Sequence, residues 1–392
     1  MTTPAPSPHA PLDPADLQRI RATVESQADT LFALAKDLYE HPETAWTEVR
    51  SSAAVAAPLA EAGFRVVTGV ADLPTAFTAT AGPSDATTRV GIVAEYDSLP
   101  GLGHACGHNL ISAAAVGAAL GAAPLLQEAG LQLSVIGTPA EEGGGGKIPM
   151  IEAGVFDGLD AAMMIHPGPD DRAWAAPFAV AHFDVTYKGK ATHAAAYPWL
   201  GVNAADAFTV AQVAIGLLRQ QLPAGTRVHG IVTSAGTAPN AIPDTATGKW
   251  YVRADSLDEL ETLYQRVVAC FEAGATATGC ELTIEETSGR YADFITDEEL
   301  LATFVDASAQ LGRDLHPEDR SRTGMNSAST DMGNVSYVVP AIHPYLGIDS
   351  APAVNHQAEF ADATMTDAAR RAVLDGAVAL AATAVSLARA RN

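Results

Sequence analysis

The sequence predicts an α/β protein whose mostly parallel, helix-flanked sheet is interrupted by a smaller inserted domain. Three observations lead to this prediction. Strand and helix patterns alternate through the first half of the chain, a β-α-β-β-α-β (ferredoxin-like) pattern fills residues 181–289, and 392 residues are too many for one ordinary core. We therefore expect a first domain formed by residues 16–180 and 290–392, an inserted domain at 181–289, and a disordered leader at 1–15.

The first domain shows short apolar patterns separated by helical ones. Residues 17–63 are rich in Ala, Leu and Glu and indicate helix, whereas apolar runs at 90–94, 131–137 and 161–165 indicate buried strands. An Ala-rich helix is expected at 111–126, and further helices at 298–311 and 366–389. In such sheets, ligand sites gather beyond the carboxyl ends of the strands. Most polar clusters of this chain stand at such ends.

The inserted domain alternates strands and helices in a different way. Phe183, Val185 and Tyr187 alternate with polar residues, as in a strand with one buried face. Asn203 is a suitable N-cap for a helix, and strands are expected at 227–234 and 247–253. A capping box that starts at Ser256 opens a second helix, and a last strand follows at 280–284.

The composition excludes several classes of protein. With 23 Lys and Arg against 46 Asp and Glu, the formal net charge is −23, so no basic surface for nucleic acid is expected. No apolar run approaches the roughly 20 residues that span a bilayer, and residues 1–14 lack the pattern of a signal peptide. The 3 cysteines are too scattered for a disulfide framework. We expect a cytoplasmic protein with no membrane partner, whose acidic surface serves solubility.

Four short stretches carry residues of the kinds that bind metals. Gly107 permits a tight turn between a cysteine and a histidine, and four glycines follow a pair of carboxylates at 141–142. Each stretch alone also fits a structural explanation, such as a core histidine or an acidic surface loop. The candidate ligands are Cys106, His108, Glu142, His166 and His356.

Taken together, these residues indicate a metal site. One Cys, three His and one Glu suit zinc or another first-row divalent ion. Five ligands exceed the four that a tetrahedral ion takes, and a bridging Cys106 thiolate would let them serve two ions. Glu141, the remaining carboxylate of the pair, is then a candidate general base.

Several motifs in order resemble the aminoacylase/carboxypeptidase group of di-metal amidohydrolases, known as peptidase family twenty. Segments 95–100 (EYDSLP) and 104–110 (HACGHNL) are most similar to its dipeptidase-like sub-branch, which includes β-alanyl-lysine dipeptidases. That sub-branch lies within the branch of hippurate, aminobenzoyl-glutamate and auxin-conjugate hydrolases. Further matching motifs lie at 189–196 (GKATHAAA), 236–240 (GTAPN) and 329–336 (STDMGNVS), so the resemblance covers nearly the whole chain beyond residue 15.

The resemblance implies two divalent ions per chain. Cys106 would bridge them, with His108 and Glu142 completing one site and His166 and His356 the other. Zinc is the expected metal, and manganese, cobalt and nickel also suit this ligand set.

The inserted domain would serve as a lid and as the contact between the subunits of a homodimer. His193 would stabilise the oxyanion in the active site of the partner subunit, and Asn240 would contact the substrate. Residues 16–180 and 290–392 would form the metal-binding catalytic domain.

At one position the sequence departs from many members of the family. They carry His-x-Asp at the end of the first strand, where this chain has Glu95-Tyr96-Asp97. In the cysteine-bridged branch that position is not a ligand, so Glu95 and Asp97 are expected to orient ligands rather than bind metal. Four other histidines, at 104, 182, 229 and 343, are expected to be structural.

The implied activity is hydrolysis of the amide bond in a small N-acyl amino acid or dipeptide. Glu141 would take a proton from a metal-activated water as it attacks the carbonyl, and would then protonate the leaving amine. Two alternatives remain open: a hydrolytic deaminase using the same site, and a metal-binding scaffold without catalytic activity.

Overall fold

The computed structural model describes residues 11–392, so the first ten residues of the expected leader lie outside the described part. Helix α1 (Pro14–Ser26) begins after Asp13, whose side chain accepts the N–H of Ala15. Pro14 suits this first turn because an N–H there would have no helical partner. Residues 14 and 15 are therefore helical, which corrects the expected end of the leader.

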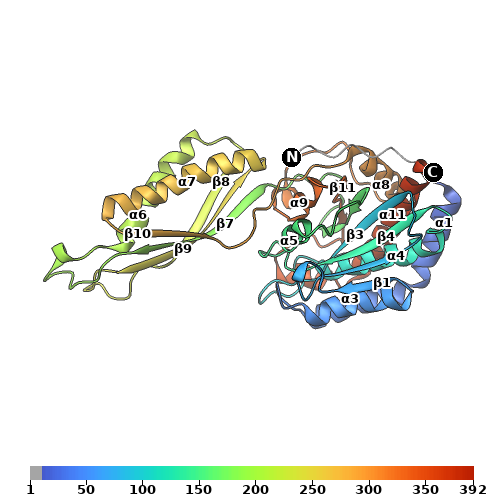
Figure 1. The fold of residues 1–392 in the computed structure, drawn as a ribbon, viewed down its shortest axis with the longest axis horizontal. Helices are drawn as coiled ribbons and strands as arrows, with labels where there is room; N and C mark the ends of the chain where they lie inside the picture. Colours follow the sequence, from blue (N-terminus) through green and yellow to red (C-terminus); the bar gives the residue numbers. More distant parts are fainter. Residues whose placement is uncertain (1–10) are drawn as a thin grey trace. The chain divides into compact units, whose positions relative to one another are not determined.

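The chain divides into two compact units. The first comprises the residues up to Pro177 together with Phe294–Asn392, and the second is Phe178–Asp293. Figure 1 shows that each unit has a sheet and helices of its own. The second unit begins at 178 rather than the expected 181 and ends at 293 rather than 289.

A six-stranded sheet forms the centre of the first unit. Its strands are β1 (Arg65–Thr68), β2 (Phe77–Ala81), β3 (Thr88–Glu95), β4 (Leu131–Thr138), β5 (Ala161–Met163) and β11 (Ala341–Ile342). They lie in the order β1-β2-β4-β3-β5-β11, and β4, β3, β5 and β11 run parallel to one another. β2 is antiparallel to both of its neighbours. The predicted mostly parallel sheet is confirmed, and the carboxyl ends of β3, β4 and β5 meet at one edge.

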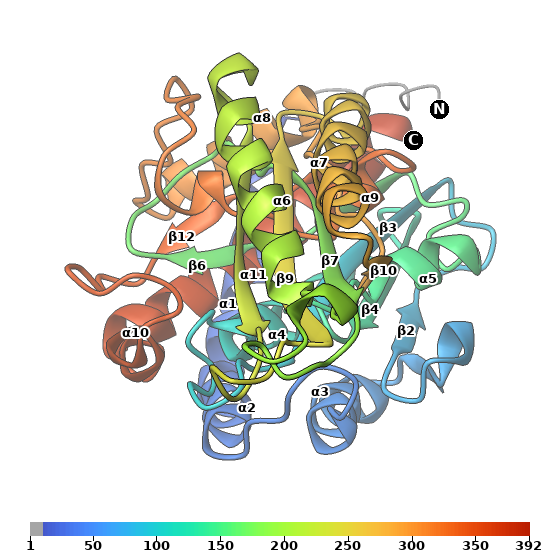
Figure 2. The ribbon, with the colours of Figure 1, turned by 90° about the vertical axis from the view of Figure 1, so that its left-hand side faces the viewer.

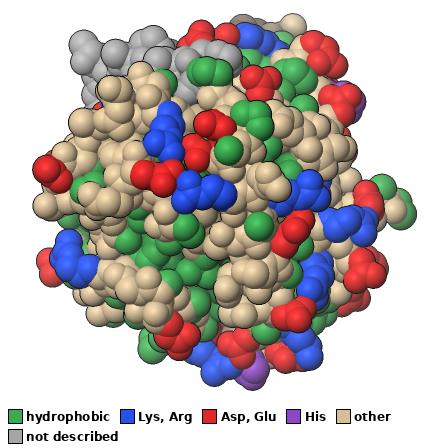
Figure 3. Space-filling model, turned by 90° about the vertical axis from the view of Figure 1, so that its right-hand side faces the viewer, with side chains coloured by type: hydrophobic (Ala, Val, Ile, Leu, Met, Phe, Trp, Pro, Cys, Tyr) green, Lys and Arg blue, Asp and Glu red, His purple; other side chains and the backbone are tan. Residues whose placement is uncertain are grey.

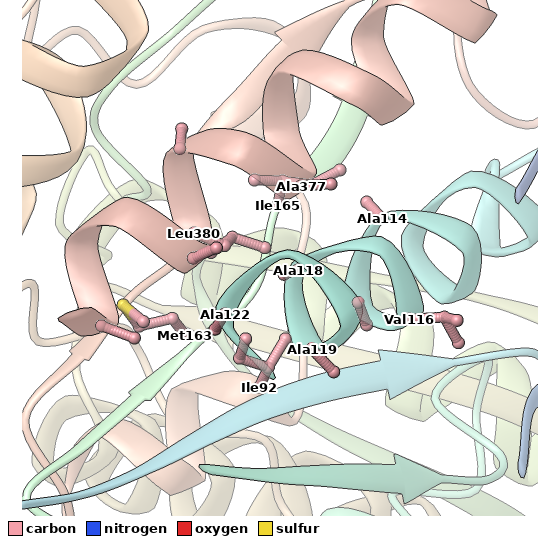
Figure 4. Close-up of a cluster of buried hydrophobic side chains, with 14 of the residues drawn as sticks. Ile92, Ala114, Val116, Ala118, Ala119, Ala122, Met163, Ile165, Ala377 and Leu380 are labelled. Carbon is pink, nitrogen blue, oxygen red and sulfur yellow. The ribbon is translucent and has the colours of Figure 1, made fainter. Parts of the chain in front are cut away.

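Helices α4 (His108–Ala122) and α11 (Asp367–Arg391) form the core beside this sheet. Figure 4 shows α4 between α11 and β3, with small side chains such as Ala118 and Ala122 at the contacts with Leu380 and Ile92. Both helices are buried on most sides because the small alanines allow close packing.

Two helical segments, His108–Leu125 and Asp367–Arg391, are long and apolar enough to cross a bilayer by length and composition. The expectation that no apolar segment approaches that length was therefore wrong. In each, 83% of the most apolar window is buried inside the protein, and the two helices pack on each other. We interpret them as core helices, because a helix that is buried on all sides needs no polar face.

The remaining helices of the first unit surround this core. They are α2 (Ala28–Glu40), α3 (Val49–Glu61), α5 (Lys147–Glu152), α8 (Glu298–Gln310), α9 (Met332–Ser336) and α10 (Ala358–Ala363). A separate two-stranded sheet pairs β6 (His166–Gly168) in parallel with β12 (Tyr345–Gly347).

The structure differs from the sequence-based expectations at several places. The expected helical region 17–63 is interrupted at 41–48, where Trp46 has a positive φ of 68°. The expected strand 161–165 ends at Met163, since β5 pairs with β3 and β11 whereas β6 pairs with β12. Strands β1 and β2 were not predicted, and α4 begins at His108, three residues before the expected start at 111.

The second unit contains β7 (Ala179–Lys188), α6 (Ala204–Leu218), β8 (Arg227–Ser234), β9 (Thr245–Ala254), α7 (Leu257–Thr278) and β10 (Glu281–Glu286), in this order along the chain. Its antiparallel sheet has the strand order β10-β7-β9-β8. Figure 2 shows α6 and α7 side by side over this sheet. The two predicted N-caps are confirmed, because Asn203 accepts the N–H of Ala205 and Ser256 accepts that of Glu259.

Charged side chains of both signs are mixed on the face of the molecule seen in Figure 3. Arg19 pairs with Glu128 at 2.7 Å, and Arg21 with Glu25 at 2.8 Å. Exposed pairs of this kind contribute about 0–1 kcal/mol each, so they favour solubility more than stability.

Candidate metal centre

The candidate ligands lie beyond the carboxyl ends of neighbouring parallel strands. β3 leads into Asp97, β4 into Glu141 and Glu142, and His166 follows shortly after β5. Cys106 lies in the loop before α4, and His108 is the first residue of that helix. Gly107 between them has a φ of 87°, and a Cβ there would lie 2.3 Å from Cγ of Pro167. The tight turn therefore requires glycine.

A carboxylate orients His108. Its Nδ1 lies 3.0 Å from Oδ1 of Asp97, and both side chains are fully buried. Although burial lowers the pKa of His108, Asp97 reverses this effect and raises the pKa well above its usual value. An Nδ1–H donated to Asp97 leaves Nε2 as the nitrogen that can bind a metal. The other oxygen of Asp97 accepts the main-chain N–H of Glu142 at 2.9 Å.

His166 is oriented in a comparable way. Its Nδ1 lies 2.9 Å from the carbonyl oxygen of Pro167, and its Nε2 lies 3.6 Å from Sγ of Cys106. Burial, followed by the neighbouring His343, lowers the pKa of His166 to about 3, so the imidazole is neutral and can act as a ligand. Burial raises the pKa of the Cys106 thiol well above its usual value, a penalty that a bound cation offsets.

Glu142 and His356 form a second pair. Nε2 of His356 lies 3.4 Å from Oε1 of Glu142, and this carboxylate raises the pKa of His356. His356 has a positive φ of 70°, and its N–H donates to the carbonyl oxygen of Ala105 at 2.8 Å. The side-chain amide of Asn355 donates to the carbonyl oxygens of Cys106 and Pro167 at 3.2 and 3.1 Å. These contacts join the loop of residue 356 to the other ligand loops.

The ligand atoms converge in two groups that share the cysteine. One group is Cys106, His108 and His166, the other is Cys106, Glu142 and His356, and within each group all ligand atoms lie within 4.8 Å of one another. This grouping differs from the pairing of His108 with Glu142 and of His166 with His356 that the resemblance implied. The physical reason is that His356 reaches the site beside Glu142, whereas His166 lies beside His108 with a ring separation of 5.9 Å.

The surroundings of His108 fit a divalent cation. Its Nε2 is buried without a hydrogen-bond partner among the described residues. Carboxylate oxygens of Glu95, Glu141 and Glu142 lie 3.5, 3.8 and 3.9 Å from this nitrogen, at or beyond the limit of a hydrogen bond. Once Nε2 gives up its proton, its lone pair, a thiol and several carboxylates form a donor set suited to a metal ion, and metal binding displaces that proton.

Glu141 is buried at the edge of this donor set. Burial, followed by the neighbouring carboxylates of Glu95 and Glu142, raises the pKa of Glu141 well above its usual value. It belongs to neither of the two groups that share Cys106, and its Oε2 lies 3.8 Å from Nε2 of His108. Its position is compatible with the expected general base.

Glu95 and Asp97, which we expected to orient ligands, have different surroundings. Asp97 contacts the ring of His108 and the main chain of Glu142. Glu95 places Oε1 2.6 Å from Nζ of Lys147, and its other oxygen faces His108. Against the cost of burial, Lys147 lowers the pKa of Glu95 to about 2. Glu95, His108 and Glu141 also form a third group with metal-ligand spacing.

Sequence reasoning missed one buried residue near this centre, Lys147, and gave another, His343, only a structural role. Lys147 is fully buried and contacts Glu95 and Asp331, and its place directly after the four glycines was a signal that we did not use. His343 is buried with its ring 5.5 Å from that of His166, and its ring nitrogens lack hydrogen-bond partners in the described part of the chain. The sequence Ile-His-Pro occurs at both 165–167 and 342–344, a repeat that could have drawn attention to His343.

His193 and Asn240 lie together in the second unit. His193 pairs with Ala241, and the N–H of Ala194 donates to the carbonyl oxygen of Asn240 at 2.9 Å. Nδ1 of His193 accepts the N–H groups of Ala195 and Ala196 at 3.3 and 3.1 Å. Because Nδ1 is an acceptor, the proton of the neutral ring is on Nε2. The adjoining segments 235–239 and 241–243 line a cavity of about 390 Å³.

Comparison with known proteins identifies the family. Residues 85–374 match peptidase family M20/M25/M40. The chain is 40% identical to the Xaa-Arg dipeptidase of Mus musculus over 94% of its own length and 88% of that protein. It is 33% identical to one of the subunits of p-aminobenzoyl-glutamate hydrolase from Escherichia coli (strain K12), over 67% of this chain and 58% of that one.

Solved structures share the fold. The aminobenzoyl-glutamate utilization protein from Klebsiella pneumoniae superposes with a TM-score of 0.74 at 20% identity, covering 92% of this chain and 96% of that one. The YXEP protein of Bacillus subtilis, a dinuclear metal binding peptidase from the M20 family, gives a TM-score of 0.68 at 21% identity, covering 92% and 98%.

The fold and the matches together define a hydrolase of amide bonds in small N-acyl amino acids or dipeptides. The chain belongs to peptidase family M20/M25/M40, and the predicted dipeptidase-like branch is confirmed by the relatives that it matches.

Proposed function

We propose that this protein is a di-metal dipeptidase, with Cys106 as the ligand that two ions share. The observation that carries the proposal is the pair of ligand groups that meet at this cysteine beside Glu141. His108 and His166 would hold one ion, and Glu142 and His356 the other. When bound, the ions supply Lewis-acid activation of water and of the amide carbonyl.

Glu141 would act as the proton shuttle. Its carboxylate accepts a proton from the attacking water as the new C–O bond forms, and it delivers that proton to the amide nitrogen as the C–N bond breaks. The buried position of Glu141 keeps bulk water from competing for this proton. Asp97 would hold His108 in the tautomer that leaves Nε2 available as a ligand.

His193 and Asn240 would bind the substrate from the second unit. The Nε2–H of His193 is available to donate to the developing oxyanion, because Nδ1 already accepts two main-chain N–H groups. We propose that His193 acts in the site of a partner subunit, within a homodimer formed through the second unit. Exposed apolar side chains on this unit, Val213 and Leu217 on α6 and Ile231 on the edge strand β8, support such a contact.

We further propose a dipeptide with a basic C-terminal residue as the substrate. Support comes from the name of the mouse relative, an Xaa-Arg dipeptidase that matches over nearly the whole chain. Zinc is the proposed metal, with manganese, cobalt and nickel as substitutes that suit the same ligands. A cytoplasmic location is also proposed, consistent with three cysteines that form no disulfide.

The test is a panel of dipeptides and N-acyl amino acids, assayed after chelation and after addition of each metal in turn. Xaa-Arg and Xaa-Lys dipeptides should be cleaved fastest, with activity proportional to metal content up to two ions per chain. Release of ammonia without cleavage of the backbone amide would favour a deaminase. Tight metal binding with no turnover on any compound would favour a scaffold, and full activity of the metal-free protein would exclude the proposal.

A further inference from the structure

The loop that carries Glu141 and Glu142 is held by buried carboxylates from three distant parts of the chain. Each accepts one main-chain N–H of the loop or of Lys147, the first residue of α5, at 2.9 Å, and each is at most 1% exposed. The pairs are Glu48 with Ala140, Asp97 with Glu142 and Asp331 with Lys147. Ala140, whose N–H donates to Glu48, directly precedes Glu141, the expected proton shuttle.

We propose that Glu48 is a positioning residue, which fixes the main chain at Ala140 and thereby places the carboxylate of Glu141. The inference rests on the proposed function, because the catalytic role of Glu141 comes from that proposal. Glu48 lies at the end of the 41–48 segment, and its Oε1 accepts the N–H of Ala140 in the loop.

Backbone strain supports this role. Ala140 and Trp46 have positive φ values of 57° and 68°, in the left-handed region that residues other than glycine rarely adopt. Oε1 of Glu48 accepts the N–H of both residues at 2.9 Å. Such residues persist only where their surroundings hold them, and they cluster at functional sites. One buried oxygen therefore stabilises two strained residues, one of which directly precedes Glu141.

The glycines that follow cannot hold the loop by themselves. Residues 143–146 are all glycine, which has the largest conformational freedom of any residue. They depend on Ala140, whose carbonyl oxygen accepts the N–H groups of Gly144 and Gly145 at 3.0 and 2.8 Å. A Cβ at Gly144 would lie 2.8 Å from the indole of Trp46. Ala140 thus links the glycine loop to Glu48, because its N–H contacts Glu48 and its carbonyl oxygen contacts the glycines.

The experiment compares two substitutions of Glu48 with one matched control. Glu48→Met removes the acceptor while keeping a side chain of similar length. In the wild type, the hydroxyl of Thr75 donates to Oε2 of Glu48 at 3.0 Å. Glu48→Gln keeps one oxygen to accept both N–H groups and places its NH2 group toward that hydroxyl, which can accept a hydrogen bond. The control, Thr75→Val, removes that hydroxyl and leaves the Oε1 contacts in place.

Amide hydrogen exchange measures the loop without reference to activity. In Glu48→Met, the amides of 140–145 should exchange about tenfold faster or more, whereas those of β4 keep their protection. With saturating metal and activity normalised to folded protein, kcat should fall about 10²-fold with KM within about threefold, as expected for a displacement of about 1 Å at the reacting group. Glu48→Gln and Thr75→Val should stay within about threefold of wild type in both measurements.

A second-site change tests the strain itself. Glycine adopts a positive φ without steric cost, so Ala140→Gly added to Glu48→Met should restore at least about tenfold of the lost kcat. If Glu48→Met only destabilised the fold, adding Ala140→Gly would not restore kcat.

Unchanged loop exchange and kcat in Glu48→Met, or no rescue by glycine, would overturn the proposal. So would a loss of kcat in Glu48→Gln as large as that expected for Glu48→Met, a result that can be obtained even if the Met variant fails to fold. If the wild type hydrolyses no amide, the proposed function fails, whereas the exchange data still decide whether Glu48 holds the loop.

Discussion

Replacement of Lys147 by methionine tests the buried charges next to the proposed metal centre. Nζ of Lys147 lies 2.6 Å from Oε1 of Glu95 and 2.5 Å from Oδ1 of Asp331, and none of the three side chains is more than 1% exposed. Against the cost of burial, the carboxylates of Asp331 and Glu95 raise the pKa of Lys147. The lysine is therefore charged, and it offsets two buried negative charges.

The expected loss follows from this geometry. Removing one partner of a buried ion pair leaves an uncompensated charge and costs about 3–5 kcal/mol of unfolding free energy. At about 1.4 kcal/mol per factor of ten, the unfolded population rises about 10²- to 10⁴-fold. The matched control is Lys36→Met, because Lys36 pairs with Glu40 at 3.4 Å on the surface of α2 and its side chain is 60% exposed. That substitution should change stability by less than about 0.5 kcal/mol.

The assay is urea unfolding of chelator-treated protein, so that metal binding does not contribute. Replacing Trp199 and Trp250 by phenylalanine in all variants leaves Trp46 and Trp174, so the fluorescence reports on the first unit alone. Adding Glu95→Gln and Asp331→Asn to Lys147→Met should recover most of the loss, because no charge then lacks a partner. If Lys147→Met and Lys36→Met have the same stability, the electrostatic reasoning is wrong.

Four further predictions concern catalysis, assembly, loop packing and pH. Glu141→Gln should keep both ions and lose about 10²- to 10⁴-fold in kcat, whereas Glu142→Gln should lose metal in elemental analysis; wild-type turnover by Glu141→Gln would reverse the assignment. Co-expressed Glu141→Ala and His193→Ala chains should regain activity that neither has alone, and mixed dimers without recovery would place His193 in its own site. Gly146→Ala should lower kcat/KM about 10²-fold, because a Cβ there would lie 2.0 Å from the carbonyl oxygen of Pro139, and an unchanged kcat/KM would contradict this. Burial lowers the pKa of His182 to about 4, so the unfolded chain binds more protons between pH 6.5 and 4. The stability that neutral His182 contributes is complete above pH 6.5 and is lost as the pH falls to 4, so denaturant unfolding of His182→Phe should show a flatter pH dependence than wild type over this range.

Much of the fold could be predicted because the relevant patterns are local. The strand at 90–94 is a continuous apolar run and that at 131–137 is mostly apolar, and both lie in the parallel part of the sheet, where both faces are covered. Asn203 and Ser256 marked the starts of α6 and α7 because capping depends on residues only two or three positions away. The interruption at 41–48 was missed, since its backbone is held by contacts such as that of the Glu43 carbonyl oxygen with the hydroxyl of Ser98, which lies far from it in sequence.

Most of the candidate ligands could also be found from the sequence, because they stand at the end of a strand or beside a glycine that marks a turn, whereas His356 lies in a polar loop. The division of these ligands into two groups could not be predicted from the sequence. Which ligand atoms face each other depends on how the loop of His356 meets Glu142 and how His166 meets His108, and these contacts join residues more than 50 positions apart.

The sequence by itself determined the family, the order of the elements and the residue types available for metal binding, since motifs and hydrophobic periodicity are written in short segments. Only the tertiary structure decided that Glu48, Lys147 and Asp331 surround the site. Their burial and pairing exist only once the 41–48 segment, the end of β3, the glycine loop and α9 have come together. A buried charge must find its partner in space, and no local pattern records which partner that will be.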